Sequence, residues 1–193
     1  MHLDTYAFSR QPAFVEPEMR KQFKQAVPLR TVVVYCYDPR AANIPHAVAK
    51  ALPGEVYPGE IVRDGSGRKI ASTTTIFPVV VAGGRAVDAL RSITVAQHLF
   101  GIENIVVVHH TYCGATSFTP EGLIEAFHAE QGVDISGLYD RDSVAIADYE
   151  SSLKRDVRLL RESKGVPRSA NIYGYLFNID TEALSPIVRD CVR

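Results

Sequence analysis

The sequence predicts an α/β domain whose mainly parallel β-sheet has about four to five strands flanked by helices. Two strand-like segments, 31–35 and 104–109, each contain an apolar run without polar alternation, which is typical of parallel strands buried on both faces. Segments with helical periodicity separate such runs, so strands and helices alternate along the chain. The 193 residues are enough to bury a substantial core, and we expect a single domain over residues 1–193.

The first part of the chain, residues 1–28, is expected to form an N-terminal arm followed by a short helix. The arm has scattered aromatic residues and no regular periodicity. The helix begins near Glu16-Pro17, because proline is tolerated in the first turn of a helix, and Pro28 ends it.

After residue 28 we expect a strand, a helix and an insertion, followed by strands that alternate with helices. Thr31 to Tyr35 is the first strand because it is rich in valine. Residues 55–75 combine turn signals with a β-prone stretch and predict a hairpin-like insertion. The clearest helix, 86–100, has an apolar stripe and ends at Gly101. The other expected elements are a helix over 44–52, strands over 77–82, 104–109 and 170–178, and helices over 120–131 and 143–164.

The composition is that of an ordinary globular protein of a reducing compartment. The 21 basic and 22 acidic residues are well mixed, which predicts no general affinity for nucleic acid or for anionic membranes. No stretch approaches about 18 consecutive apolar residues, so no membrane span is expected. Three dispersed cysteines do not suggest a disulfide framework, and Cys191 is expected to be a free thiol. The first ten residues show no secretory pattern, and the expected location is cytoplasmic.

Reactive side chains follow the predicted strands at the point where each strand ends. Cys36, Asp38 and Arg40 follow the first strand, and His110 and Cys113 follow a later apolar run. Because ligands of open parallel sheets bind beyond the carboxyl ends of the strands, these side chains are expected to meet there. Two thiolates and one imidazole are typical of a catalytic rather than a structural zinc site. The fourth tetrahedral position stays open to water, whose pKa zinc lowers to about 7.

Asp38 and Arg40 have two possible arrangements beside such a site. An aspartate held by arginine can accept a hydrogen bond from the zinc-bound water and orient its lone pair. Alternatively, the aspartate coordinates zinc itself and closes the site. The residue types leave both arrangements open.

Two neighbouring features are expected to have structural roles. Alternation along a strand turns His109 away from His110, so we expect it to be packed in the interior. The charged cluster over 154–162 is expected to be a solvated helix face with paired charges.

The segments 36–40 (Cys-Tyr-Asp-Pro-Arg) and 110–114 (His-Thr-Tyr-Cys-Gly) resemble the signature of the β-class carbonic anhydrases. That signature is Cys-x-Asp-x-Arg, followed later in the chain by His-x-x-Cys-Gly. The resemblance is to the compact subgroup, which includes carbonyl sulfide and carbon disulfide hydrolases. It extends through 82–84 (Ala-Gly-Gly) and covers about residues 28–180.

This resemblance implies a β-carbonic anhydrase-like fold, one Zn2+ per chain and a small-molecule substrate. It also implies a homodimer, or a higher homo-oligomer, with the active-site cleft at the subunit interface. The implied site residues are Cys36, His110 and Cys113 as zinc ligands, Asp38 and Arg40 as the catalytic pair, and Gly83 and Gly84 as the turn whose backbone N–H groups hold the substrate's oxygens.

The sequence departs from the family pattern at three places. Val80 and Val81 stand where the family usually has Arg-Asn, Tyr112 replaces a residue that is often small and polar, and the insertion 55–75 is longer than usual. A less polar pocket would suit a less polar substrate. The main hypothesis is a zinc-dependent carbonic anhydrase that hydrates carbon dioxide to bicarbonate. The alternatives are a zinc hydrolase of carbonyl sulfide or carbon disulfide and a non-catalytic zinc-binding family member.

Overall fold

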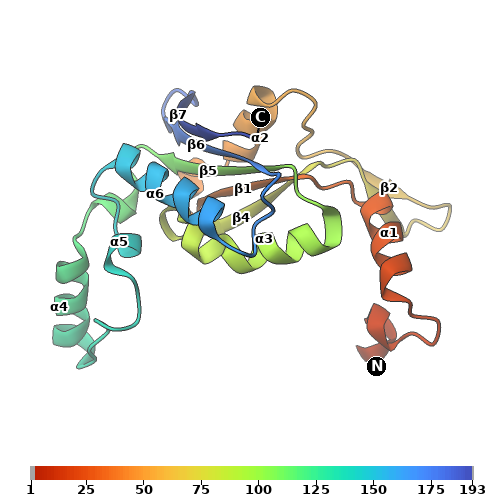
Figure 1. Ribbon diagram of the computed structural model, residues 1–193, viewed down its shortest axis with the longest axis horizontal. Coiled ribbons are helices and arrows are strands. Elements are labelled where there is room, and N and C mark those ends of the chain that lie inside the picture. The colour runs from red at the N-terminus through yellow and green to blue at the C-terminus, as the bar shows by residue number, and fades with distance from the viewer. Residues whose placement is uncertain (1–2, 193) are drawn as a thin grey trace.

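The computed structural model describes residues 3–192 of the chain (Figure 1). Its α-helices are α1 (Glu16–Ala26), α2 (Ile44–Ala51), α3 (Ala86–Phe100), α4 (Pro120–Gln131), α5 (Arg141–Val144) and α6 (Tyr149–Glu162). Its strands are β1 (Thr31–Cys36), β2 (Ile61–Arg63), β3 (Lys69–Ser72), β4 (Ile76–Val81), β5 (Asn104–His110), β6 (Asn171–Phe177) and β7 (Leu184–Asp190). A 3-10 turn, η4 (Ala82–Gly84), joins β4 to α3.

The central sheet has five strands in the order β4-β1-β5-β6-β7. The first four run parallel to one another, and β7 runs antiparallel to β6 along one edge. The predicted α/β class with a mainly parallel sheet is therefore confirmed. The sequence interpretation missed β7, which contains Pro186 and lacks a clear alternation. Because proline cannot donate a ladder hydrogen bond, an edge strand is where a sheet tolerates it.

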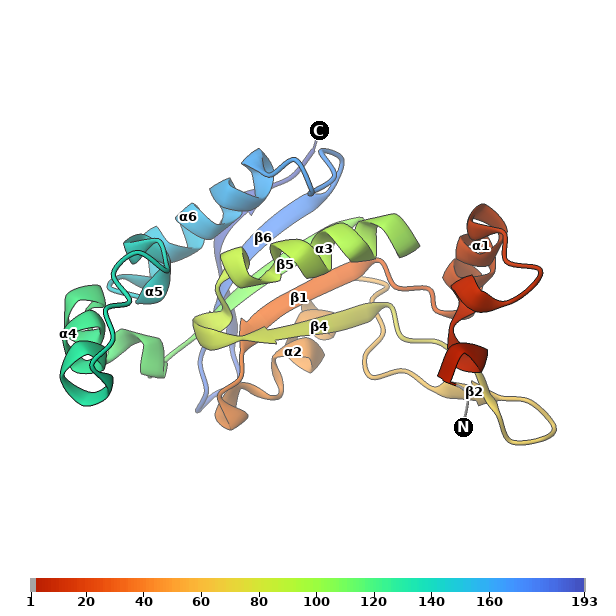
Figure 2. The ribbon, with the colours of Figure 1, turned by 90° about the horizontal axis from the view of Figure 1, so that it is seen from below.

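Both faces of the sheet are buried, as the unbroken apolar runs predict. Helices α3 and α6 cover one face and α2 covers the other (Figures 1 and 2). In β1, Val32 and Val34 belong to the core under α3 and α6, whereas Val33 and Tyr35 belong to the core under α2. This alternation explains why the strand needs apolar residues at consecutive positions.

The prediction of a single helix over 143–164 is wrong, because the chain forms two helices in this region. Helix α5 ends at Val144, and α6 begins at Tyr149. The Asp148 side chain caps α6 by accepting a hydrogen bond from the Ser151 N–H at 2.7 Å. Between the helices, Ile146 N donates to Ala115 O at 2.9 Å, which ties this segment to the loop after β5.

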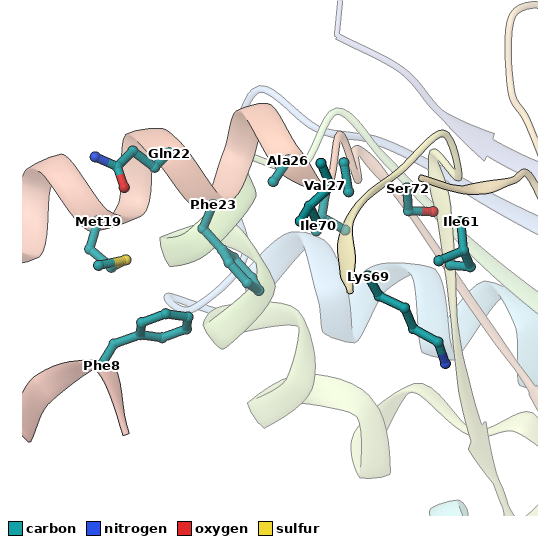
Figure 3. A pocket seen from close by; sticks show the side chains of 11 residues that line it. Phe8, Met19, Gln22, Phe23, Ala26, Val27, Ile61, Lys69, Ile70 and Ser72 are labelled. Atoms are coloured by element: carbon teal, nitrogen blue, oxygen red, sulfur yellow. The ribbon is translucent and has the colours of Figure 1, made fainter. Parts of the chain in front are cut away.

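The N-terminal helix α1 and the hairpin of β2 and β3 lie together at one end of the molecule (Figure 1). The two strands of the hairpin pair antiparallel within the segment 55–75. The ring of Phe23 contacts Phe100 at 5.6 Å between centroids and so holds α1 against α3. A groove of about 510 Å³ lies between α1 and the hairpin, with Phe8 and Ile70 in its lining (Figure 3).

Within the described residues, none of the helices combines the length and the apolar character needed to cross a bilayer.

The turn at Gly84 offers a direct test of the packing at the strand ends. Gly84 has φ +67°, and a Cβ there would lie 2.7 Å from Val108 O and 3.0 Å from Tyr35 Cα. Gly132 has the same φ, but a Cβ there would have nothing within 4 Å. We expect Gly132→Ala to cost about 1–2 kcal/mol of backbone strain. Gly84→Ala should cost about 1–3 kcal/mol more because of the clash.

Urea denaturation of the two variants and the wild-type protein measures this difference. Equal losses of unfolding free energy in the two variants would contradict the close approach at Gly84.

Candidate metal centre

Cys36 and His110 are the last residues of two neighbouring parallel strands, β1 and β5. The register pairs Tyr35 with Val108, so the two strands end within one residue of the same level of the sheet. The loop after β5 places Cys113 beside them, with its sulfur 3.9 Å from that of Cys36. All three side chains are buried, and their ligand atoms lie within 4.8 Å of one another. The structure therefore brings together three candidate metal ligands, which come from the ends of two strands and from the loop after one of them.

The imidazole of His110 is oriented by its own loop. Its Nδ1 lies 2.9 Å from Thr111 O, and this contact makes Nδ1 the donor and leaves a lone pair on Nε2. Nε2 is buried and has no hydrogen-bond partner among the described residues. An orphaned buried nitrogen is costly unless a ligand satisfies it. Facing two sulfurs, this nitrogen completes a donor set that fits Zn2+.

The Cys113 thiol is unfavourable as an anion unless a cation is present. Burial raises the pKa of the Cys113 thiol to about 11, and the neighbouring Cys36 sulfur contributes to the increase. A bound divalent cation reverses this preference, because a coordinating thiol is deprotonated outright. The buried Cys113 thiol is therefore suited to hold a cation rather than to exist as a free thiolate.

Asp38 and Arg40 form a two-pronged ion pair beside the cluster. Arg40 Nε donates to Asp38 Oδ1 at 3.0 Å and Nη2 donates to Oδ2 at 2.7 Å. The Arg40 backbone N–H also donates to Oδ1 at 3.0 Å. These hydrogen bonds hold the pKa of Asp38 at about 2. Asp38 Oδ2 lies 3.9 Å from His110 Nε2, so the carboxylate rests on Arg40 while remaining next to the three candidate ligands.

A pocket of about 450 Å³ opens above these residues. Gly83 lines it, whereas Gly84 is buried below, against the backbone of β1 and β5. Val80 is 48% exposed on the edge strand β4, and Tyr112 is 72% exposed, so neither departure from the family pattern gives the pocket its apolar character. The lining consists of Cys36, Tyr37, Asp38, Pro39, Ala82, Gly83, Gly114, Ala115, Ser117, Phe118 and Val144.

Known proteins resemble the chain in sequence at moderate identity. No protein-family model matches it. Beta-carbonic anhydrase 1 of Mycobacterium tuberculosis is 27% identical over 100 residues, which cover 52% of this chain and 59% of that protein. The carbon disulfide hydrolase of Acidithiobacillus thiooxidans is 26% identical over 121 residues, covering 54% of this chain and 60% of that one. The chain thus spans about 60% of the length of these curated relatives.

Solved structures share the fold over nearly the whole chain. The carbonic anhydrase from Streptococcus mutans has a TM-score of 0.64 and 24% identity, covering 96% of this chain and 93% of that one. A carbon disulfide hydrolase in its apo form has a TM-score of 0.61 and 19% identity, covering 89% and 85% respectively. Sequence relatives and fold neighbours therefore point to the same group. The chain resembles the β-carbonic anhydrases and the carbon disulfide hydrolases in sequence over about half its length, and it shares their fold.

A buried ion pair, which sequence reasoning missed, supports the site from below. Arg85 Nε lies 3.1 Å from Asp156 Oδ2, and the two side chains are only 3% and 2% exposed. Asp156 Oδ2 also accepts a hydrogen bond from Ala86 N at 3.1 Å. The other side of the guanidinium donates to Ser143 O at 2.9 Å and Ala145 O at 3.0 Å. One ion pair thus joins the η4 turn to α6 and to the segment that carries Val144.

The placement of Asp156 corrects the expectation of a solvated helix face over 154–162. Burial raises the pKa of this carboxyl, while hydrogen bonds and the charge of Arg85 oppose the increase. The signal that could have revealed it is its position in α6. Asp156 lies three residues after Leu153 and directly before Val157, both of which are buried in the core.

His109 is packed in the interior, as its position in the strand predicts. Its Nε2 lies 2.9 Å from Ser152 Oγ on α6. Burial is the main reason that its pKa is lowered to about 3, so the ring is neutral. The side chain therefore belongs to the packing between β5 and α6.

Removing one partner of the buried pair should destabilise the protein strongly. We expect Asp156→Ala to lower the free energy of unfolding by about 3–5 kcal/mol, because the Arg85 guanidinium is left buried without a counter-charge. Glu150→Ala is the matched control, since its pair with Lys154 on the same helix is exposed and such pairs contribute little. Chemical denaturation measures both variants, and a loss in Asp156→Ala no larger than that of the control would refute the role of the pair.

Proposed function

We propose that this protein is a zinc-dependent carbonic anhydrase that hydrates carbon dioxide to bicarbonate. One observation carries the proposal. The buried Cys36–His110–Cys113 cluster, with a histidine nitrogen left unpaired, adjoins an arginine-held Asp38 at an apolar pocket. The charged pair is difficult to explain in a purely structural metal site, which would need a fourth protein ligand instead.

Cys36, His110 and Cys113 would hold one zinc ion per chain. Bound there, zinc supplies a water whose pKa is lowered to about 7, and hence a nucleophile at neutral pH. The backbone carbonyl of Thr111 accepts a hydrogen bond from the His110 imidazole and so fixes the orientation of this proposed ligand. Such outer partners of metal-bound histidines set both the tautomer and the ring orientation.

Asp38 and Arg40 act as the catalytic pair in this proposal. With its pKa near 2, Asp38 is ionised at neutral pH and only accepts hydrogen bonds. It therefore accepts the O–H of the nucleophile and leaves the oxygen lone pair directed at the substrate. Arg40 occupies both carboxylate oxygens and so opposes movement of Asp38 toward the two sulfurs.

The pocket walls suit a small, uncharged, linear substrate. Ala115, Phe118 and Val144 provide apolar surface that excludes water from the reacting centre. Backbone N–H groups near Gly83 and Gly84 would hold the substrate's oxygens. A Cβ at Gly83 would lie 3.1 Å from Ala115 Cβ, so glycine keeps this wall open. The bicarbonate leaves through the pocket mouth, and the proton released in the reaction passes to solvent.

Hydrolysis of carbonyl sulfide or carbon disulfide is the second candidate activity. The apolar lining supports it, and so does the 26% identity to the carbon disulfide hydrolase of Acidithiobacillus thiooxidans. A non-catalytic zinc protein is the third candidate, but it gives no reason for the Asp38–Arg40 geometry.

We also propose that the protein acts in the cytoplasm as a homodimer or higher homo-oligomer. The tetrameric β-carbonic anhydrases of Sordaria macrospora, at a TM-score of 0.54, are consistent with assembly on this fold.

The metal ligands are tested by a pair of cysteine variants. Cys113→Ser should lose zinc and turnover together, because an alcohol is a far poorer zinc ligand than a thiolate. Cys191→Ser is the control, since Cys191 is an exposed free thiol near the C-terminus. Zinc is measured per chain by elemental analysis of the purified proteins. Stoichiometric zinc in Cys113→Ser would remove that residue from the ligand set.

The reaction is tested by measuring turnover of carbon dioxide, carbonyl sulfide and carbon disulfide by the zinc-loaded protein at pH 6–9. We expect carbon dioxide to be the best substrate. Asp38→Asn should keep its zinc and lose about 10–100-fold in kcat, as is usual when a partner beside a metal site is removed. Asp64→Asn is the control, because Asp64 forms a similar Asp–Arg pair with Arg68 in the hairpin. Unchanged turnover in Asp38→Asn would refute the catalytic pair, and faster turnover of a sulfur compound would favour the second candidate.

A further inference from the structure

Tyr112 adopts a backbone conformation that residues other than glycine rarely adopt. Its φ is +55°, and the only other non-glycine residue with positive φ among the described residues is Glu182, at +56°. The Tyr112 side chain is 72% exposed, so packing of the ring does not account for this conformation. An unfavourable backbone conformation persists where the surrounding structure enforces it, and such residues concentrate at functional sites.

The left-handed turn directs the Tyr112 carbonyl at the catalytic pair. Arg40 Nη2 donates to Tyr112 O at 3.1 Å while it also donates to Asp38 Oδ2 at 2.7 Å. The same nitrogen thus connects the end of β1 to the loop after β5. The Arg40 side chain is 54% exposed, so the contact with Tyr112 O gives the guanidinium a restraint on the protein beyond its ion pair with Asp38.

The loop that contains Tyr112 is anchored on the opposite side by β6. Thr111 N donates to Phe177 O at 2.9 Å, and Ile179 N donates to Thr111 Oγ1 at 3.2 Å. Thr111 is therefore fixed on one side of Tyr112, and the buried Cys113 is fixed on the other. With both neighbours held, the Tyr112 peptide has little freedom to turn its carbonyl away from Arg40.

We propose that Tyr112 is a positioning residue of the site and acts through its backbone. Its left-handed conformation presents a carbonyl that fixes the Arg40 guanidinium, and Arg40 in turn keeps Asp38 beside the Cys–His–Cys cluster. The phenol ring plays no part in this. The inference rests on the proposed function, because it assigns Tyr112 to the positioning of the proposed catalytic pair.

The test compares substitutions by their tolerance of positive φ. Tyr112→Val places a β-branched residue where the left-handed conformation is strongly disfavoured. We expect kcat to fall about tenfold, the usual effect of losing a hydrogen bond to a charged group, with KM little changed and one zinc per chain retained. Tyr112→Gly is the rescue variant, because glycine adopts positive φ freely, and its kcat should return to within about threefold of wild type.

Glu182→Val controls for backbone strain alone. Glu182 has nearly the same φ but lies in the turn between β6 and β7, where its side chain accepts a hydrogen bond from Asn43 Nδ2 at 2.7 Å. We expect this variant to lose thermal stability without a change in kcat. A fall in kcat as large as that of Tyr112→Val would show that general strain explains both and would overturn the proposal.

A double-mutant cycle with Arg40→Lys locates the effect. A lysine cannot hold Asp38 with two prongs and reach Tyr112 O at once, so Tyr112→Val should add little to the loss caused by Arg40→Lys. Multiplicative losses would overturn the proposal, as would equal losses in Tyr112→Gly and Tyr112→Val or loss of zinc from Tyr112→Val.

A readout that does not depend on turnover is the NMR signal of the Arg40 Nε–H group in 15N-labelled protein, assigned by its absence in Arg40→Lys. We expect the signal to be sharp in wild type and Tyr112→Gly and broadened in Tyr112→Val. Zinc-loaded wild type that turns over none of the three substrates would refute the proposed function, whereas the Arg40 signal would still test the backbone contact. Identical Arg40 signals in all three proteins would overturn the contact itself.

Discussion

The parallel register between β1 and β5 is the constraint on which the site depends. Because both strands end within one residue of the same level of the sheet, a cysteine and a histidine separated by more than seventy residues become neighbours. Gly84 sits directly against these ends, where a Cβ would meet the backbone of β1 and of β5. The two strands and the η4 turn can therefore approach one another only because Gly84 has no side chain.

Burial gives the cluster its chemical character. The interior raises the pKa of Cys113 and leaves His110 Nε2 without a partner among the described residues, so the protein alone stabilises neither the Cys113 thiolate nor the lone pair on that nitrogen. A soft divalent cation satisfies all three groups at once. Asp38 has the opposite environment, since Arg40 keeps it ionised at the edge of the same pocket. In the proposed site, these two neighbouring environments would assign metal binding and hydrogen bonding to different residues.

The strand-end motifs were predictable because they depend on local sequence. Valine-rich runs identify buried strands, and the parallel arrangement then dictates where their ends lie. The β7 strand and the break between α5 and α6 were harder to predict, since Pro186 and Asp148 take their roles from tertiary context. The partner of Arg85 was also hidden, because nothing local distinguishes Asp156 from the solvated charges beside it. Contacts between distant segments decide such cases, and propensity says little about them.

Carbon dioxide and carbon disulfide, the substrates of two of the candidate activities, would meet the same pocket walls in this protein. Both substrates are linear, uncharged and small, and walls formed by Ala115, Phe118 and Val144 make no directional contacts with either. An apolar wall discriminates between ligands of similar shape by only about 1–3 kcal/mol. Backbone N–H groups at the Gly83 turn, in the role proposed for them, would discriminate more, because oxygen accepts hydrogen bonds well and sulfur accepts them weakly. Under the proposed function, substrate preference would therefore depend on the balance between the η4 turn and the apolar walls, because the proposed metal ligands would serve both reactions.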